Sequence, residues 1–117
     1  MILIKEGVEF KYSPGGIAIL DSLKTLSHLI GKDLTITSGS DGVHSGENDP
    51  HYSGDAYDVR SHDLDDNVKA LVIKQLDNLL GDKKFFFFLE VPGTANEHFH
   101  IQVRNEQEFS IEDYLKL

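Results

Sequence analysis

Two short motifs in this chain contain side chains that could hold a metal ion. The first, HYSGDAYD, runs from His51 to Asp58, and the second, EHFH, runs from Glu97 to His100. Two histidines and a carboxylate are a typical ligand set for a catalytic zinc ion, which keeps a fourth position open for water. The pKa of that water falls to roughly 7, and a spare carboxylate can accept its proton.

The first motif places a histidine and an aspartate seven residues apart. Gly54 and Ala56 lie between them, and small residues allow the tight turn that would bring a loop histidine and a strand carboxylate onto one ion. Taken alone, the motif is equally consistent with a solvated His51 and an Asp58 that caps a turn. His44 lies in the same loop and could exchange roles with His51. The small-residue turn favours His51 as the ligand and leaves His44 as a surface or cleft residue.

The second motif predicts a metal-binding face on a strand. Side chains alternate along a strand, so His98 and His100 would point to one side and Phe99 to the other, into the core. Without the first motif, a pair of surface histidines on an edge strand would be the commoner interpretation. Strict alternation places Glu97 on the face away from His100. We therefore expect irregular backbone after residues 94–96 to turn Glu97 toward the metal-bound water.

The combined pattern, HxxGxAxD followed about forty residues later by ExxH, resembles a known family. It is similar to the zinc D-alanyl-D-alanine carboxypeptidases and dipeptidases, which include phage endolysins that cut the L-alanyl-D-glutamate bond and share a core with the hedgehog signalling domain. The resemblance covers residues 36–103. It implies that His51, Asp58 and His100 hold Zn²⁺ and that Glu97 is the general base. It also implies that His98 stabilises the transition state, because some members have a histidine there.

Two positions differ from the family pattern. Members commonly carry serine two residues before the first histidine ligand, where this chain has Asp49. The strand at residues 34–38 usually continues into a Ser-Gly-Tyr-Arg-like segment, whereas this chain reads SGSD at 38–41. A guanidinium is the natural bidentate partner of a free carboxylate. Arg60 or Arg104 could replace the missing cation, but we favour an endopeptidase-like or otherwise altered specificity over either replacement.

Composition limits the class of protein. The 117 residues, 39% hydrophobic and 26% charged, fit a single metallopeptidase-like catalytic domain spanning 1–117, which we expect to be a monomer. Without cysteine, the chain can form neither disulfides nor thiolate zinc sites. The net charge of −9 argues against a nucleic-acid partner, because such binding needs clustered cations. No apolar run is long enough for a membrane span, so we expect no membrane contact. The start lacks signal-peptide features, so we expect synthesis in the cytoplasm and action on the cell wall after release or delivery.

Hydrophobic periodicity predicts the elements that position these residues. Apolar residues recur at helical spacing over 14–30 and 64–80, each stretch being followed by glycine. Strand patterns occupy 34–37, 56–59, 85–91 and 98–104, and the phenylalanine-rich run at 85–91 is expected to be buried on both faces. Residues 2–4 and 8–12 indicate a hairpin or an extended N-terminal arm, and 111–117 a final helical turn.

These elements predict an α+β fold. We expect a small antiparallel sheet with two main helices packed on one face, similar to the hedgehog and D-alanyl-D-alanine peptidase fold. The metal would lie on the exposed face of the sheet, beneath the loop at 39–53.

Three functions are compatible with these residues. The first is a zinc peptidase that hydrolyses amide bonds in peptidoglycan stem peptides, of the D,D-carboxypeptidase or L-alanyl-D-glutamate endopeptidase type, with Glu97 as the base. The second is a noncatalytic zinc-binding module, such as a phage virion component. The third is another metal-dependent hydrolase, such as a nuclease, which the charge disfavours. A His/His/Asp set also accepts other divalent ions.

Overall fold

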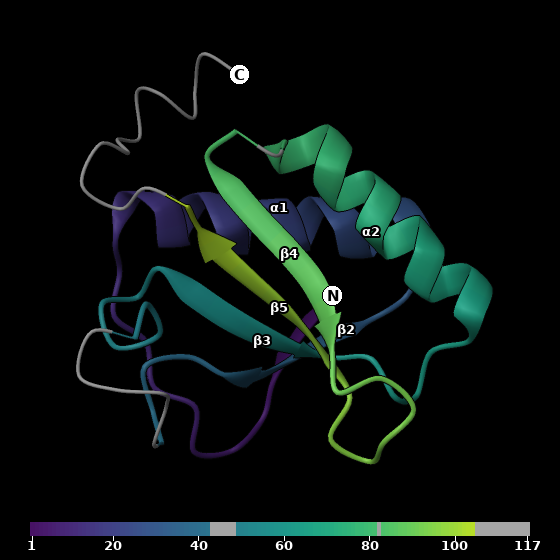
Figure 1. Ribbon diagram of the computed structural model, residues 1–117, viewed down its shortest axis with the longest axis horizontal. Helices are drawn as coiled ribbons and strands as arrows, with labels where there is room; N and C mark the ends of the chain where they lie inside the picture. Colours follow the sequence, from purple (N-terminus) through teal and green to yellow (C-terminus); the bar gives the residue numbers. More distant parts are fainter. Residues whose placement is uncertain (43–48, 82, 105–117) are drawn as a thin grey trace.

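The computed structural model of the protein describes residues 1–42, 49–81 and 83–104. Within these residues, two helices pack against a five-stranded sheet (Figure 1), so the α+β class expected from the sequence is confirmed. His44 and the expected helical turn at 111–117 lie outside the described residues. Neither helix in the described part of the chain combines the length and the apolar character needed to cross a membrane.

Both helices begin and end at residues whose chemistry favours a boundary. Helix α1 (Pro14–Ile30) follows Ser13, whose hydroxyl accepts a hydrogen bond from the backbone N–H of Gly16, and it ends at Gly31 in the left-handed conformation. Helix α2 (Asp66–Leu80) begins two residues later than expected. The reason is that Asp65 is the N-cap and accepts from the backbone N–H of Val68 at 2.9 Å.

The sheet has the strand order β1-β2-β3-β5-β4. Its strands are β1 (Ile2–Ile4), β2 (Leu34–Ser38), β3 (Ala56–Arg60), β4 (Phe85–Glu90) and β5 (His98–Val103). All neighbours are antiparallel except β1 and β2, so the expectation of a purely antiparallel sheet is wrong. Because α1 connects β1 to β2 as a crossover, the chain returns to the sheet in the same direction. Of the two alternatives for the N-terminus, the hairpin does not form, since residues 8–12 contain no strand, and the extended arm remains.

The expectation that the phenylalanine-rich strand is buried on both faces is also wrong. Strand β4 lies at an edge of the sheet, and Phe88 is 41% exposed, whereas Phe85 is completely buried. The physical reason is that Phe85 belongs to the core under the helices, whereas Phe88 lies on the opposite face. There the Phe88 ring packs 5.3 Å from the ring of His100.

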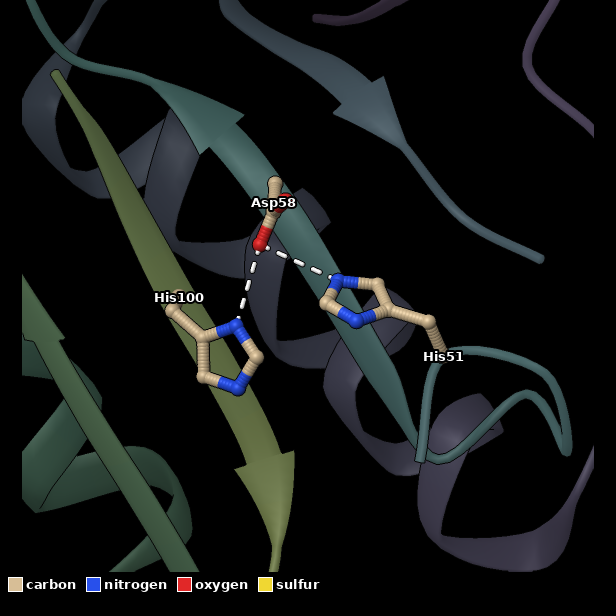
Figure 2. Close-up of side chains that lie close together, drawn as sticks. All are labelled: His51, Asp58 and His100. Carbon is tan, nitrogen blue, oxygen red and sulfur yellow. Dashed lines mark hydrogen bonds and ion pairs between the residues drawn. The ribbon is translucent and has the colours of Figure 1, made fainter. Parts of the chain in front are cut away.

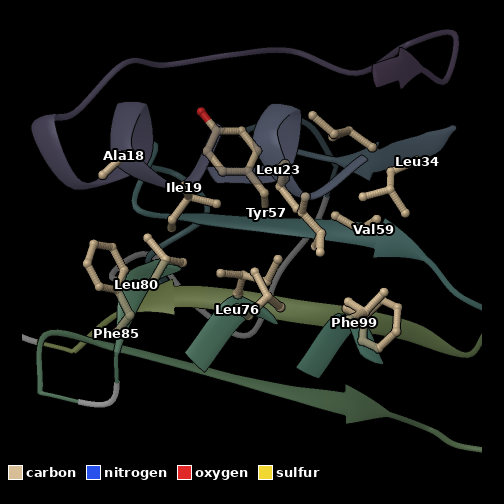
Figure 3. Packing of buried hydrophobic residues seen from close by; sticks show 14 of the residues in the cluster. Ala18, Ile19, Leu23, Leu34, Tyr57, Val59, Leu76, Leu80, Phe85 and Phe99 are labelled. Atoms are coloured by element: carbon tan, nitrogen blue, oxygen red, sulfur yellow. The ribbon is translucent and has the colours of Figure 1, made fainter. Parts of the chain in front are cut away.

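One hydrophobic core lies between the helices and the sheet (Figure 3). Tyr57 and Val59 of β3 and Phe99 and Ile101 of β5 point into it and are almost completely buried. Because side chains alternate along a strand, the intervening residues of β3 and β5 point to the opposite face. The core therefore determines which face of the sheet carries the polar groups described next.

Candidate metal centre

The three predicted metal ligands meet on the face of the sheet opposite the core (Figure 2). Oδ1 of Asp58 lies 3.1 Å from Nε2 of His51 and 3.1 Å from Nδ1 of His100. Ligands of tetrahedral zinc lie about 2.0–2.1 Å from the ion, which separates neighbouring ligand atoms by roughly 3.3 Å. The observed spacing therefore fits a small divalent ion.

Strand register brings two of these ligands together. Asp58 of β3 is paired directly with His100 of β5, and residues opposite each other in antiparallel strands have neighbouring side chains. His98 lies on the same face as His100, as the alternation of the second motif predicts, because Phe99 and Ile101 occupy the core side. The pairing of β3 with β5 thus supplies the carboxylate of Asp58 and the imidazoles of His98 and His100.

A tight turn before β3 supplies His51. The backbone N–H of Gly54 donates to the carbonyl of His51 at 3.1 Å, and that of Asp55 donates to the carbonyl of Pro50 at 2.9 Å. Gly54 has φ +83°, which favours glycine, and a Cβ atom there would lie 1.9 Å from the carbonyl oxygen of Lys11. The glycine of the first motif therefore serves both the turn and the close passage of the N-terminal segment.

Each histidine of this face uses its other ring nitrogen for a second contact. Nδ1 of His51 donates to Oδ1 of Asp49 at 2.9 Å, and Nε2 of His100 donates to Oε1 of Gln102 at 2.7 Å. Nδ1 of His98 donates to the backbone carbonyl of Asn96 at 2.7 Å. Such outer contacts fix the tautomer and orient the remaining nitrogen toward an ion.

Asp49 and Gln102 were not predicted as site residues. Asp49 occupies the position at which the family usually has serine, and its carboxylate also accepts from the backbone N–H of His51 at 2.9 Å. Gln102 follows His100 by two residues on the same strand, so alternation was a usable signal for it. For Asp49 the signal was its place two residues before His51, where the family that the motifs resemble commonly has serine.

The charges of the cluster are strongly coupled. Burial opposes ionisation of Asp58, but hydrogen bonds from His100 and His51 outweigh it and hold the pKa of this carboxyl well below its usual range. Burial likewise disfavours the charged imidazoles, but Asp58 outweighs it and raises the pKa of both His51 and His100. Without an ion, the two imidazoles therefore retain protons that a metal ion would displace.

The expected orientation of Glu97 is wrong. Its side chain is 4% exposed and is held by Lys69 of α2, whose Nζ lies 2.7 Å from Oε2, and by the hydroxyl of Ser61, which donates to Oε2 at 2.8 Å. The backbone N–H of Gly93 donates to Oε1 at 3.1 Å. Lys69 is the main cause that lowers the pKa of Glu97 to about 2, followed by the hydrogen bonds from Gly93 and Ser61. Glu97 lies just before β5, after the turns at 91–96, and its carboxylate is engaged by Lys69 and Ser61 rather than by the triad.

A different carboxylate lies beside the triad. Oε1 of Glu90, at the end of β4, is 3.2 Å from Nε2 of His98 and 3.8 Å from Nδ1 of His100. Nε2 of His98 is also 3.6 Å from Oδ2 of Asp58. Glu90 was not predicted, because its place opposite His98 depends on the pairing of β4 with β5. Among the described residues, ligand atoms within 4.8 Å of one another form two groups, His51/Asp58/His100 and Asp58/Glu90/His98.

Two adjoining cavities make the cluster accessible. The cluster lines a cavity of about 590 Å³, which is also walled by Phe86 and Phe88. A neighbouring cavity of about 290 Å³ shares His98 and is lined by Lys5 and Arg60. Arg60 is paired with His98 across β3 and β5 and therefore lies on the same face of the sheet. A ligand at the cluster could thus reach a cation in the next cavity.

The second arginine lies at the other end of the site. Nε of Arg104 donates to the carbonyl of Phe85 at 3.0 Å, and its guanidinium carbon is 5.3 Å from the centre of the Phe86 ring. Arg104 therefore packs against Phe86, which lines the larger cavity.

Comparison with known proteins found no match among protein-family models, curated proteins or solved structures.

Proposed function

We propose that this protein is a zinc-dependent hydrolase that cleaves amide bonds in peptidoglycan stem peptides. The observation that carries the proposal is the convergence of His51, Asp58 and His100, from a loop and two strands, at ligand spacing in an open cavity. The outer contacts of both imidazoles and the resemblance of the two motifs to a zinc peptidase family support the same conclusion.

In this proposal His51, Asp58 and His100 hold the ion through the nitrogens and the oxygen that face one another. A zinc ion bound there would supply an acidic water and a positive charge that polarises a carbonyl group. The chain itself must then provide a group that accepts the proton of the water. Glu90 is the carboxylate in the cavity that fits this role, because Lys69 already holds Glu97 in an ion pair.

His98 would act on the carbonyl oxygen of the substrate rather than on the water. Its Nδ1 is used by the carbonyl of Asn96, and its Nε2 points into the space between Glu90 and Asp58. As an N–H donor through Nε2, His98 would donate to the carbonyl oxygen as negative charge develops there. A positioned donor of this kind contributes on the order of 3 kcal/mol to transition-state stabilisation.

The adjoining cavity supports a substrate that carries a carboxylate. Stem peptides are rich in carboxylates, and Arg60 with Lys5 supplies two cations within that cavity. Arg60 would thus take over the binding role of the arginine that is missing after Ser38. A guanidinium suits this role because it binds a carboxylate in a bidentate manner.

Digestion of purified peptidoglycan by the zinc-loaded protein, followed by mass spectrometry of the fragments, tests this proposal. We expect new amine and carboxyl ends at one type of bond, either released D-alanine or a cut between L-alanine and D-glutamate. The variant His100→Ala should lose the activity. Intact stem peptides after incubation with protein that demonstrably contains zinc would contradict a hydrolytic function.

A noncatalytic metal-binding module is the second candidate. It is favoured by the ion pair of Glu97 with Lys69, because the carboxylate that the resemblance assigns as the base is engaged elsewhere. In this case the protein would bind zinc through the same three residues and leave peptidoglycan unchanged. The same digestion therefore separates the two candidates.

A further inference from the structure

The two oxygens of Asp58 face different groups. Oδ1 contacts His51 and His100, whereas Oδ2 lies 3.6 Å from Nε2 of His98. His98 in turn lies 3.2 Å from Oε1 of Glu90. A carboxylate placed in this way can bridge two ions, one on each oxygen.

We propose that a second divalent cation binds between Asp58, Glu90 and His98, so that Asp58 bridges a pair of metal ions. The inference rests on the first ion of the proposed function, which occupies His51, Asp58 and His100. It adds a second site with a ligand set of one imidazole and two carboxylates.

The spacing of the second group fits an ion as well as that of the first. The contacts of His98 Nε2 with Glu90 and Asp58, at 3.2 and 3.6 Å, bracket the roughly 3.3 Å expected between ligands of one small cation. Strand register produces this arrangement, because His98 is paired with Glu90 on one side and lies beside Asp58 on the same face. The three ligands come from the adjacent strands β3, β5 and β4.

The hydrogen bond of His98 independently points to a ligand. Its Nδ1–H donates to the backbone carbonyl of Asn96 at 2.7 Å, so the neutral ring has its lone pair on Nε2, the atom that faces both carboxylates. His51 and His100 show the same arrangement, with an outer partner on one nitrogen and Asp58 on the other. Second contacts of this kind are characteristic of histidines that bind metals.

Charge balance also permits two ions. Asp58 and Glu90 carry two negative charges, which would partly offset the four positive charges of two divalent ions. The chain has a net charge of −9, so a further cation meets no general repulsion. Two positive side chains lie near this site, Arg60, which is paired with His98, and Lys5, which lines the adjoining cavity.

The second ion should bind more weakly than the first. The side chain of Glu90 is 43% exposed, whereas those of His51 and His100 are largely shielded from water. Two carboxylates and one imidazole also form a harder ligand set, which accepts Mn²⁺ more readily than a site with two imidazoles does. The ions would therefore bind in sequence.

A metal pair would add a second positive charge to the proposed mechanism. Two ions roughly 3.5–4 Å apart hold and activate one water between them and stabilise both attacking and leaving groups. The second ion would take the place of the proton on His98, so that its charge stabilises the developing oxyanion. Glu90 would bind this ion through one oxygen and retain the other for the proton of the water.

Metal content of the full chain tests the inference directly. We would strip the protein of metal, titrate it with Zn²⁺ and with Mn²⁺, and measure bound ions by calorimetry and elemental analysis. The wild type should bind two ions per chain, the second at least about tenfold more weakly. His98→Ala and Glu90→Gln should bind one, and the control His28→Ala, on α1, should bind two.

The spectrum of bound Mn²⁺ gives a reading that does not depend on activity. Two neighbouring ions should give a spin-coupled paramagnetic resonance signal in the wild type, and this coupling should be lost in both Glu90→Gln and His98→Gln. A single bound ion in saturated wild type, or two ions retained by the folded His98 and Glu90 variants, would overturn the inference. Peptidoglycan cleavage with one bound ion would leave the proposed function intact, whereas two bound ions without cleavage would refute that function alone.

Discussion

Replacement of Gly54 by alanine should both destabilise the protein and weaken metal binding. Gly54 has φ +83°, and an added Cβ would lie 1.9 Å from the carbonyl oxygen of Lys11 and 2.6 Å from its carbonyl carbon. These are backbone atoms, so the contact can be relieved only when the N-terminal segment or the turn that carries His51 moves.

The expected loss of unfolding free energy is the sum of two terms. A left-handed conformation costs alanine roughly 1–2 kcal/mol, and overpacking against well-packed neighbours costs about 1–3 kcal/mol. The sum of about 2–5 kcal/mol corresponds to a fall in melting temperature on the order of 10 °C or more for a domain of this size. Displacement of the turn should also move His51 away from Asp58 and lower the affinity for zinc.

Thermal unfolding of the metal-free protein, with Gly7→Ala as a matched control, measures the two terms separately. Gly7 also has a positive φ, of 92°, but nothing lies within 4 Å of its Cβ position. The control should therefore lose only the conformational term, and its zinc affinity should be unchanged. Equal losses of stability in the two variants would refute the close approach of Gly54 to Lys11.

Three further predictions concern the site. Glu90→Gln should slow peptide hydrolysis strongly with little change in melting temperature. Glu97→Gln should lower the melting temperature and retain much of the activity, because Glu97 links the turn before β5 to α2. Kinetics and unfolding curves that show the reverse pattern would identify Glu97 as the base. Raising the pH should destabilise the metal-free protein, because the pKa values of His51 and His100 are raised in the folded state. The stability that this contributes is complete below about pH 6.5 and is lost as both residues deprotonate. The stability of the zinc-loaded protein should instead rise with pH, since the ion binds neutral imidazoles. Melting curves measured against pH in chelator and in zinc test this, and parallel trends in the two would contradict the coupling of the imidazoles to Asp58. Asp49→Ala should weaken zinc binding about 10- to 100-fold by removing the partner of His51 Nδ1, and an unchanged affinity in competition titrations would show that this contact does not orient the ligand.

The two main helices were predictable because their signals are local. Ser13, Pro14 and Gly31 mark the ends of α1, and the predicted bounds agree with the structure. The first residues of the chain were not predictable in the same way. Their parallel pairing with β2 depends on the crossover through α1 and on a free sheet edge, neither of which can be read from the sequence of 2–4.

The candidate site was partly predictable for the same reason. The small-residue turn before Asp58 and the alternation of His98 and His100 are local patterns, and the structure brings these side chains together. The irregular backbone expected before Glu97 is present at 91–96, but it does not turn this carboxylate to the triad. The contact of Glu97 with Lys69, on a helix remote in sequence, could not be read from the motif.

The sequence by itself determined the helices, the strands and a set of side chains suited to one divalent ion, because those features depend on neighbours a few residues apart. Only the tertiary structure decided which carboxylate joins them. The register that pairs β3 with β5 and β5 with β4 places Asp58 and Glu90 around His98 and His100. The pairing of β3 with β5 joins residues 42 positions apart in the chain, and both registers depend on how the core faces of the strands pack together under the helices.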